Sequence, residues 1–160
     1  MKPREATNGC GPHVTFGAMN PMPIPSIVHQ HAEEATVLRH VRSRAVRAPD
    51  LGFFLLARLD ERIAVHLDGL LVAGRYGMNL AIAGLDEPGT GECFVAAALA
   101  IEDRDAASLE NVLSRCGAIS SARLGVTSAF GWVSAASLRG ITQSLLNSED
   151  LFRRQVGIAA

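Results

Sequence analysis

The sequence predicts an all-α protein built from stacked pairs of helices, and two observations support this fold class. The first is composition, because aromatic residues make up only 5% of the chain and runs of β-branched residues, which favour strands, are scarce. The second is a series of helix-start residues about fourteen positions apart, at Asp105, Ser120 or Ser121, Ser134 and Ser148. Two such helices make a unit of about thirty residues, which is typical of helical-hairpin arrays.

Apolar positions in the second half of the chain follow a similar period. One set recurs at an offset of 29, from Leu109, Val112 and Cys116 to Leu138, Ile141 and Leu145. Another recurs at an offset of 30, from Phe94, Ala96 and Leu99 to Leu124, Val126 and Ala129. A loop insertion between two units would account for the difference of one residue.

The N-terminal segment, residues 1–24, contains Pro and Gly at many positions and lacks helical or strand periodicity. It predicts a disordered tail. Met19 and Met22 lie near its end, and either could be the true start, with the preceding residues an over-extension. Residues 25–160 are expected to form one helical domain, because a chain of this length can bury a single continuous core.

The first two predicted helices span 26–47 and 51–73. Ser26 and Asp50 are candidate N-caps, and Pro49 ends the first helix. Each helix has an apolar face at the helical period. These faces consist of Ile27, Val28, Ala35, Leu38, Val41 and Ala45 in the first helix, and of Leu55, Leu56, Leu59, Ile63, Leu67 and Leu70 in the second.

Six further helices complete a predicted total of eight. Gly74 and Gly77 interrupt the chain before the third, and Thr90 is a candidate N-cap of the fourth. The six are expected at 78–85, 91–101, 106–116, 121–132, 135–146 and 149–160.

Four polar residues lie on or beside the apolar faces of the first two helices: His31, Glu34, Arg42 and Asp60. An unpaired buried charge costs several kcal/mol, so these residues are predicted to form one buried polar network that sets the register of the first helical hairpin. The alternative is a metal or proton-transfer site made of His31, Glu34, Asp60 and His66. The chain has no Glu-x-x-His or His-x-x-x-His pair, so no helix presents two ligands on adjacent turns, and the structural network is favoured.

Charge provides no general attraction for nucleic acid or membrane, because 15 basic and 16 acidic residues give a net charge of −1. The arginines at 39, 42, 44 and 47 are scattered around their helix, which favours a solvated or ion-paired surface over a phosphate site. No apolar run approaches the roughly 20 residues that span a bilayer, and no secretory signal follows Met1. A cytoplasmic location is therefore expected.

No motif assigns a catalytic residue, a cofactor or a metal ligand. Gly89-Thr90-Gly91 lacks the Gly-Lys-Ser/Thr of a nucleotide loop, and the serines have no nucleophile-elbow setting. Cys10, Cys93 and Cys116 have no metal-type spacing, so they are expected to be free thiols, the last two behaving as small buried apolar residues.

Five motifs nevertheless resemble those of one family. They are His31-Ala32-Glu33-Glu34-Ala35; Leu59-Asp60-Glu61-Arg62 with His66-Leu67-Asp68-Gly69-Leu70; Pro88-Gly89-x-Gly91-Glu92 with Phe94-x-Ala96-Ala97; Ser128-Ala129-Phe130-Gly131-Trp132; and Arg153-Arg154-x-x-Gly157-Ile158-Ala159-Ala160.

Together these motifs span about residues 24–160 and resemble an uncharacterised proteobacterial family of HEAT-repeat-like proteins. The resemblance implies a right-handed α-solenoid with no assigned activity and no catalytic residues. Genes of this family often lie in bacterial secretion neighbourhoods, type VI among them. Family members typically continue through several more repeats, so this chain resembles a short member matching the N-terminal part.

The expected function is that of a non-catalytic scaffold or adaptor that binds a protein partner, with an accessory role in secretion as one possibility. One alternative is a small metal-binding or enzymatic protein that uses His31, Glu34, Asp60 and His66. Another is a truncated remnant without a function of its own. The final helix suggests where a contact could form, since no further repeat follows to cover it. The candidate interaction patch on this helix consists of Leu151, Phe152, Val156 and Ile158. The same patch is also a candidate homodimer contact.

Overall fold

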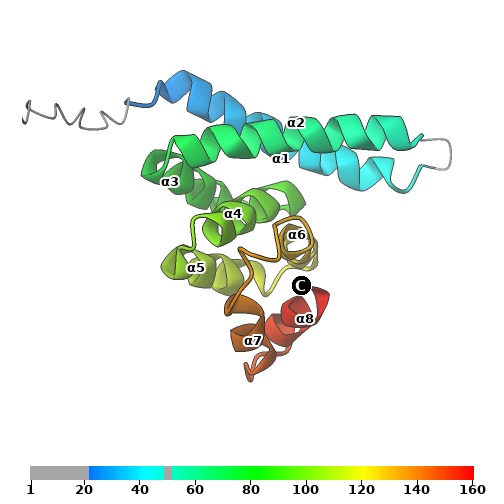
Figure 1. The fold of residues 1–160 in the computed structure, drawn as a ribbon, viewed down its shortest axis with the longest axis vertical. Helices are drawn as coiled ribbons and strands as arrows, with labels where there is room; N and C mark the ends of the chain where they lie inside the picture. Colours follow the sequence, from blue (N-terminus) through cyan, green and yellow to red (C-terminus); the bar gives the residue numbers. More distant parts are fainter. Residues whose placement is uncertain (1–21, 49–51) are drawn as a thin grey trace, which may run out of the picture.

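The computed structural model describes residues 22–48 and 52–160, and within these ranges it contains eight α-helices, one short 3-10 helix and no strand (Figure 1). The prediction of an all-α fold with about eight helices is confirmed. No helix in these ranges is long and apolar enough to cross a membrane. The elements are α1 (Pro25–Ala45), α2 (Phe53–Val72), α3 (Arg75–Ala83), η1 (Gly84–Asp86), α4 (Thr90–Glu102), α5 (Ala106–Cys116), α6 (Ser120–Phe130), α7 (Ile141–Leu146) and α8 (Leu151–Ala159).

Two sequence predictions lie outside the described residues. Most of the predicted disordered tail falls on residues 1–21, and the predicted cap Asp50 and helix stop Pro49 fall on residues 49–51. The described chain enters α1 directly, with Ile24 in the N-cap position and Pro25 in the first turn. Proline suits this position because the first-turn N–H groups have no partner within the helix.

The helices are stacked along the longest axis of the molecule (Figure 1). The α1–α2 hairpin forms one end, α7 and α8 form the other, and α4 and α6 lie between them in close contact. Helix α4 also contacts α1, α2, α3 and α5, so other helices surround it. This position explains its sequence, because residues 93–101 are apolar without interruption and all are buried.

A glycine permits a close approach in this core, between α4 and α6. A Cβ atom on Gly125 of α6 would lie 2.3 Å from the carbonyl oxygen of Thr90 and 3.1 Å from the Cβ of Cys93. Any side chain at this position would force the two helices apart. Cys93 and Cys116 are buried free thiols, as predicted. The S–H group of Cys93 is the donor in the hydrogen bond from Cys93 to Cys116, and this bond together with burial raises the pKa of the Cys93 thiol.

Among the predicted helix starts in the second half, only Asp105 caps its helix as expected. Its carboxylate accepts hydrogen bonds from the backbone N–H groups of Ala107 and Ser108 at 3.1 and 3.0 Å. Helix α6 begins after Ile119, which has no side-chain acceptor, so the predicted serine cap is wrong. Helix α8 is capped by Asp150, which accepts from the N–H of Arg153 at 2.9 Å, and not by Ser148.

The capping predictions for Ser26 and Thr90 are also wrong, because both residues lie within the first turn of their helices. The Thr90 hydroxyl instead donates a hydrogen bond to the carbonyl oxygen of Ser121, at 3.0 Å. It therefore joins the start of α4 to the start of α6, which is a tertiary role that a local capping pattern does not predict.

The predicted helix 135–146 is only half formed. The Ser134 hydroxyl accepts from the N–H of Ser137 at 3.2 Å, but the chain then continues as turns up to Gly140. Gly140 has a φ of 82°, in the left-handed region that a right-handed helix cannot include. Helix α7 therefore starts only at Ile141.

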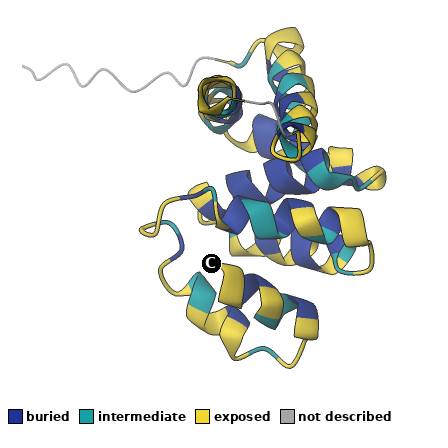
Figure 2. Cartoon of the chain, turned by 90° about the vertical axis from the view of Figure 1, so that its right-hand side faces the viewer, coloured by how far each residue is buried: buried dark blue, intermediate teal, exposed yellow. Residues whose placement is uncertain are grey.

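The predicted apolar faces of α1 and α2 are buried along most of their length. The exceptions are Ile27 at the start of α1, which is 48% exposed, and residues near the end where the two helices are joined, although Ala45 at that end is buried. Leu38, Leu59 and Ile63 are buried, whereas Val41 and Leu55 are 43% and 49% exposed. The hairpin extends beyond the helices that cover it, and Figure 2 views the molecule from the side of this projecting end. The helical period correctly predicted which faces are apolar. It could not predict how far along α1 and α2 the other helices cover these faces.

Candidate functional site

The predicted polar network between α1 and α2 is divided into separate side-chain pairs. The structure brings Arg42 to Asp60, as predicted, but places Glu34 beside Arg62 and His31 beside His66. The pairs in order from the joined end of the hairpin are Arg42–Asp60, Glu34–Arg62 and His31–His66.

The Arg42–Asp60 pair is bidentate. Nε and Nη2 of Arg42 both donate to the Asp60 carboxylate, the second at 3.0 Å, and the hydrogen bond to Asp60 raises the pKa of Arg42. The two side chains are 28% and 34% exposed, so water weakens their attraction. The pair joins α1 to α2 but does not form the fully buried network that was expected.

The His31–His66 contact joins the same helices further from the joined end of the hairpin. The two Nδ1 atoms are 3.0 Å apart and the rings meet edge to face, with centroids at 5.1 Å. Such a contact requires one nitrogen to donate and the other to accept, so it is lost when both rings are protonated. Burial lowers the pKa of His66, and a charge on His31 lowers it further.

The metal-site alternative required His31, Glu34, Asp60 and His66 to converge. Of these four, the structure brings only the two histidines into contact, because each carboxylate is paired with an arginine. Within residues 22–48 and 52–160, no group of three or more His, Cys, Asp or Glu side chains is arranged to hold a metal ion.

Arg39 was expected on a solvated or ion-paired surface, and for this residue the expectation is wrong. It is buried, with 7% of its surface exposed, and its guanidinium donates to the hydroxyls of Ser43, at 2.7 Å, and Ser128. Its Cζ lies 4.9 Å from the centroid of the Phe94 ring, a cation–π distance. Burial lowers its pKa. Arg39 thus connects α1 to α4 and α6, and its position four residues after the buried Ala35 was the available sequence signal.

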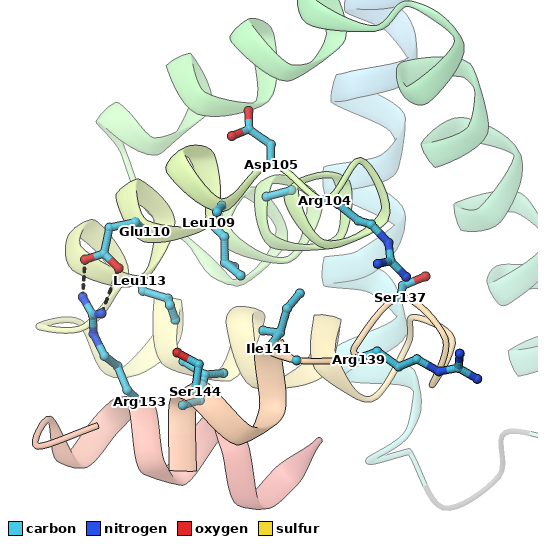
Figure 3. Close-up of a pocket in the computed structure, with 14 residues that line it drawn as sticks. Arg104, Asp105, Leu109, Glu110, Leu113, Ser137, Arg139, Ile141, Ser144 and Arg153 are labelled. Carbon is cyan, nitrogen blue, oxygen red and sulfur yellow. Dashed lines mark hydrogen bonds and ion pairs between the residues drawn. The ribbon is translucent and has the colours of Figure 1, made fainter. Parts of the chain in front are cut away.

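A groove of about 340 Å³ lies between α5 and the segment that contains α7 and α8 (Figure 3). Its apolar wall has one side from α5 and the other from α7, with two residues one helical turn apart on each. These four residues are Leu109 and Leu113 on α5 and Ile141 and Leu145 on α7. The groove exists because Gly140 turns the chain and delays the start of α7.

Charged groups line both ends of the groove. At one end Arg153 is bidentate to Glu110, with one contact of 2.8 Å, and this bond lowers the pKa of the Glu110 carboxyl (Figure 3). At the other end Arg104 donates to the carbonyl oxygen of Ala136 at 2.8 Å. Arg104 has a φ of 53°, which is unusual for a residue with a side chain.

The carboxylates that line the groove already have structural partners. Glu110 is bound by Arg153, and Asp105 caps α5, where the backbone hydrogen bond from Ser108 lowers its pKa. Both are therefore held ionised by groups of the fold itself. Apolar walls with fixed charges at the ends suit the binding and orientation of an apolar segment.

The predicted C-terminal patch is divided by the packing of α8. Phe152 and Val156 are 3% and 0% exposed, because α8 packs against α6 and α7. Phe152 also lies under the guanidinium of Arg123, with Cζ 4.9 Å from the ring centroid. Leu151 and Ile158 remain 69% and 77% exposed, so only these two of the four residues are available for a contact.

No protein-family model, no curated protein and no solved structure matches this chain. The resemblance to the HEAT-repeat-like family therefore rests on the five sequence motifs alone.

Proposed function

We propose that this chain is a helical-repeat scaffold that binds a protein partner in the groove between α5 and α7. The observation that carries the proposal is the pair of facing apolar rows, Leu109 with Leu113 and Ile141 with Leu145, on the two helices that line the groove. A partner helix or extended segment can place its apolar side chains between two such rows, as in helix-in-groove recognition.

The ends of the groove support recognition of an oriented segment. Arg153 and Glu110 lie at one end and Arg104 at the other, so a partner that presents polar groups outside its apolar residues would find hydrogen-bonding groups at both ends. The volume, about 340 Å³, is near the lower limit of ligand pockets, which suits a few inserted side chains.

A right-handed HEAT-like solenoid is part of this proposal. The succession of contacts from α1 to α4, from α4 to α6 and from α6 to α8 supports it, because each unit of a solenoid touches its neighbours in the stack. Such a stack presents an extended surface, and the groove lies between its last two pairs of helices.

The test is affinity purification from the source organism with two single-site variants. Ser144→Trp fills the groove from an exposed position on α7, whereas Gln143→Trp adds the same ring to the next residue, which does not line the groove. We expect the wild type and Gln143→Trp to retain the same partner and Ser144→Trp to lose it. The partner must then bind the purified protein directly.

Retention of that partner by Ser144→Trp would overturn the proposal. Because the resemblance places related genes near secretion systems, components of such systems are the first partners to test by direct binding.

A homodimer through α8 is a separate proposal. Leu151 and Ile158 support it, because both are large apolar residues that remain mostly exposed at the end of the stack.

A further inference from the structure

The joined end of the α1–α2 hairpin carries the most exposed aromatic side chains of the described chain. Phe53 and Phe54, in the first turn of α2, are 91% and 90% exposed. Leu55 and Val46 beside them are 49% and 51% exposed. We call residues 41–48 and 52–58 the hairpin tip; it projects beyond the rest of the stack in Figure 1. Burial in α2 begins only at Leu59, so the tip contributes little to the core.

The apolar residues at the tip surround the end of a helix and do not form a stripe. Residues 53–56 are Phe, Phe, Leu and Leu, and successive side chains on a helix point about 100° apart. These four therefore cover a complete turn, of which Phe53, Phe54 and Leu55 are exposed and Leu56 packs against the core. A helix that binds a protein groove shows apolar residues at i, i+3, i+4 and i+7, on one side only. An apolar ring that is exposed over most of a helical turn instead suits a medium that contacts it from several directions.

Arginines flank this ring. Arg44, Arg47 and Arg58 are exposed, and none forms an ion pair with a carboxylate in the described part of the chain. Over residues 41–60 the sequence has four arginines against two aspartates, although the whole chain has a net charge of −1. The hairpin tip therefore carries a local positive charge, although the net charge of the whole chain is slightly negative.

We infer that the hairpin tip docks on an anionic lipid surface, with Phe53 and Phe54 in the outer acyl region and the three arginines at the headgroups. Arg58 lies four residues after Phe54, about 6 Å along the helix axis, so its charge lies behind the exposed phenylalanine rings. Basic residues at that level are attracted to anionic lipids. This proposed peripheral contact differs from the expectation of no membrane partner, which was based on the net charge of the whole chain and not on the local charge of the tip.

A second copy of the chain is a poorer occupant, since two tips in contact would bring six arginines together. A protein partner is an outcome of the test below. The inference does not depend on the groove, so the Ser144→Trp variant should dock as the wild type does.

The experiment is flotation of the full chain with vesicles. One set contains equal parts of phosphatidylcholine and phosphatidylglycerol, and the other contains phosphatidylcholine alone. The test variant is Phe53→Ser/Phe54→Ser, and the matched control is Val65→Ser/Val72→Ser, which removes two exposed apolar residues from the same helix away from the tip. Circular dichroism confirms that each variant is folded.

We expect wild type and control to float with the anionic vesicles and not with the neutral ones. Loss of both phenylalanines should reduce partitioning by roughly 100-fold, at about tenfold for each buried ring. Replacing Arg44 and Arg47 by Gln should reduce it by about fivefold for each arginine, and about 0.5 M NaCl should do the same to the wild type.

Three results would overturn the inference: no flotation of the wild type, equal binding to neutral vesicles, or retention by the phenylalanine variant. If the wild type does not float but the tip variant loses a protein partner in the affinity purification, the tip is a protein contact and the lipid inference is wrong.

Discussion

Replacing Arg39 by alanine should destabilise the protein by about 2 kcal/mol. The guanidinium makes hydrogen bonds to Ser43 and Ser128, and a hydrogen bond that involves a charged group contributes about 1.5–3 kcal/mol. Its position over Phe94 adds about 1 kcal/mol, and its buried aliphatic stem packs between α1 and α4. Burial of a cation that has only hydroxyl partners offsets part of this gain, so the net loss is smaller than the sum.

Urea denaturation followed by circular dichroism measures the effect, and two further variants separate the causes. Arg39→Met keeps most of the stem but removes the charge, so it should cost less than about 1 kcal/mol, because the desolvation penalty disappears with the hydrogen bonds. Arg44→Ala is the matched control: it is the same substitution in the same helix at an exposed position, and it should change stability by less than about 0.5 kcal/mol. The reasoning is refuted if Arg39→Ala unfolds at the same urea concentration as Arg44→Ala.

Four further predictions concern single sites. Asp60→Ala should cost only about 1 kcal/mol in urea denaturation, and less in high salt, because its ion pair is about one-third exposed; a loss several times larger would show a fully buried network. The lowered pKa of His66 means that the unfolded chain binds more protons, so stability should fall as pH drops from 7 through about 6.5, and His66→Gln should show a smaller fall; equal pH profiles would contradict this. Gly125→Ala should cost roughly 2 kcal/mol or more by thermal denaturation, because its Cβ would meet the Thr90 carbonyl oxygen at 2.3 Å, whereas Gly131→Ala, with its nearest contact at 3.8 Å, should be tolerated. Light scattering over a concentration series should show a dimer that Ile158→Glu abolishes; a wild type that stays monomeric would rule out the α8 contact.

Local chemistry made some helix starts predictable from the sequence and others not. Asp105 could be placed because a carboxylate that caps a helix acts on the next three residues only. Ser134 gave the same kind of signal and does form a turn, but the left-handed conformation of Gly140 ends it. A capping pattern shows where a helix can begin and contains no information on whether it continues.

Contacts between distant segments were beyond the reach of periodicity. The Arg39 guanidinium is buried because it donates a hydrogen bond to Ser128, 89 residues away, and lies over the ring of Phe94. No local sequence pattern predicts such distant partners. The same holds for the polar residues of the first hairpin. Their helical faces were predicted correctly, but the position of each residue along the hairpin decides that Arg42 meets Asp60 and that His31 meets His66.

The two proposed binding surfaces, the groove and the hairpin tip, lie where neighbouring helices no longer cover the chain. Val41 and Leu55 of the hairpin tip lie on the same helical faces as the buried residues further along α1 and α2, so the sequence predicted a core where the structure shows an exposed end. The groove arises from the late start of α7, which the sequence placed at Ala135 and the structure places at Ile141. Both differences come from the ends of elements, which single-sequence patterns define least well.

Hydrogen exchange of the purified protein, with and without the partner captured by affinity purification, tests the proposed scaffold function most directly. Backbone amides of α5 and α7, whose apolar rows face each other across the groove, should exchange more slowly when the partner is bound. The amides of the α1–α2 hairpin tip should be unaffected. Protection confined to the tip or to α8, with no change in α5 and α7, would contradict the account.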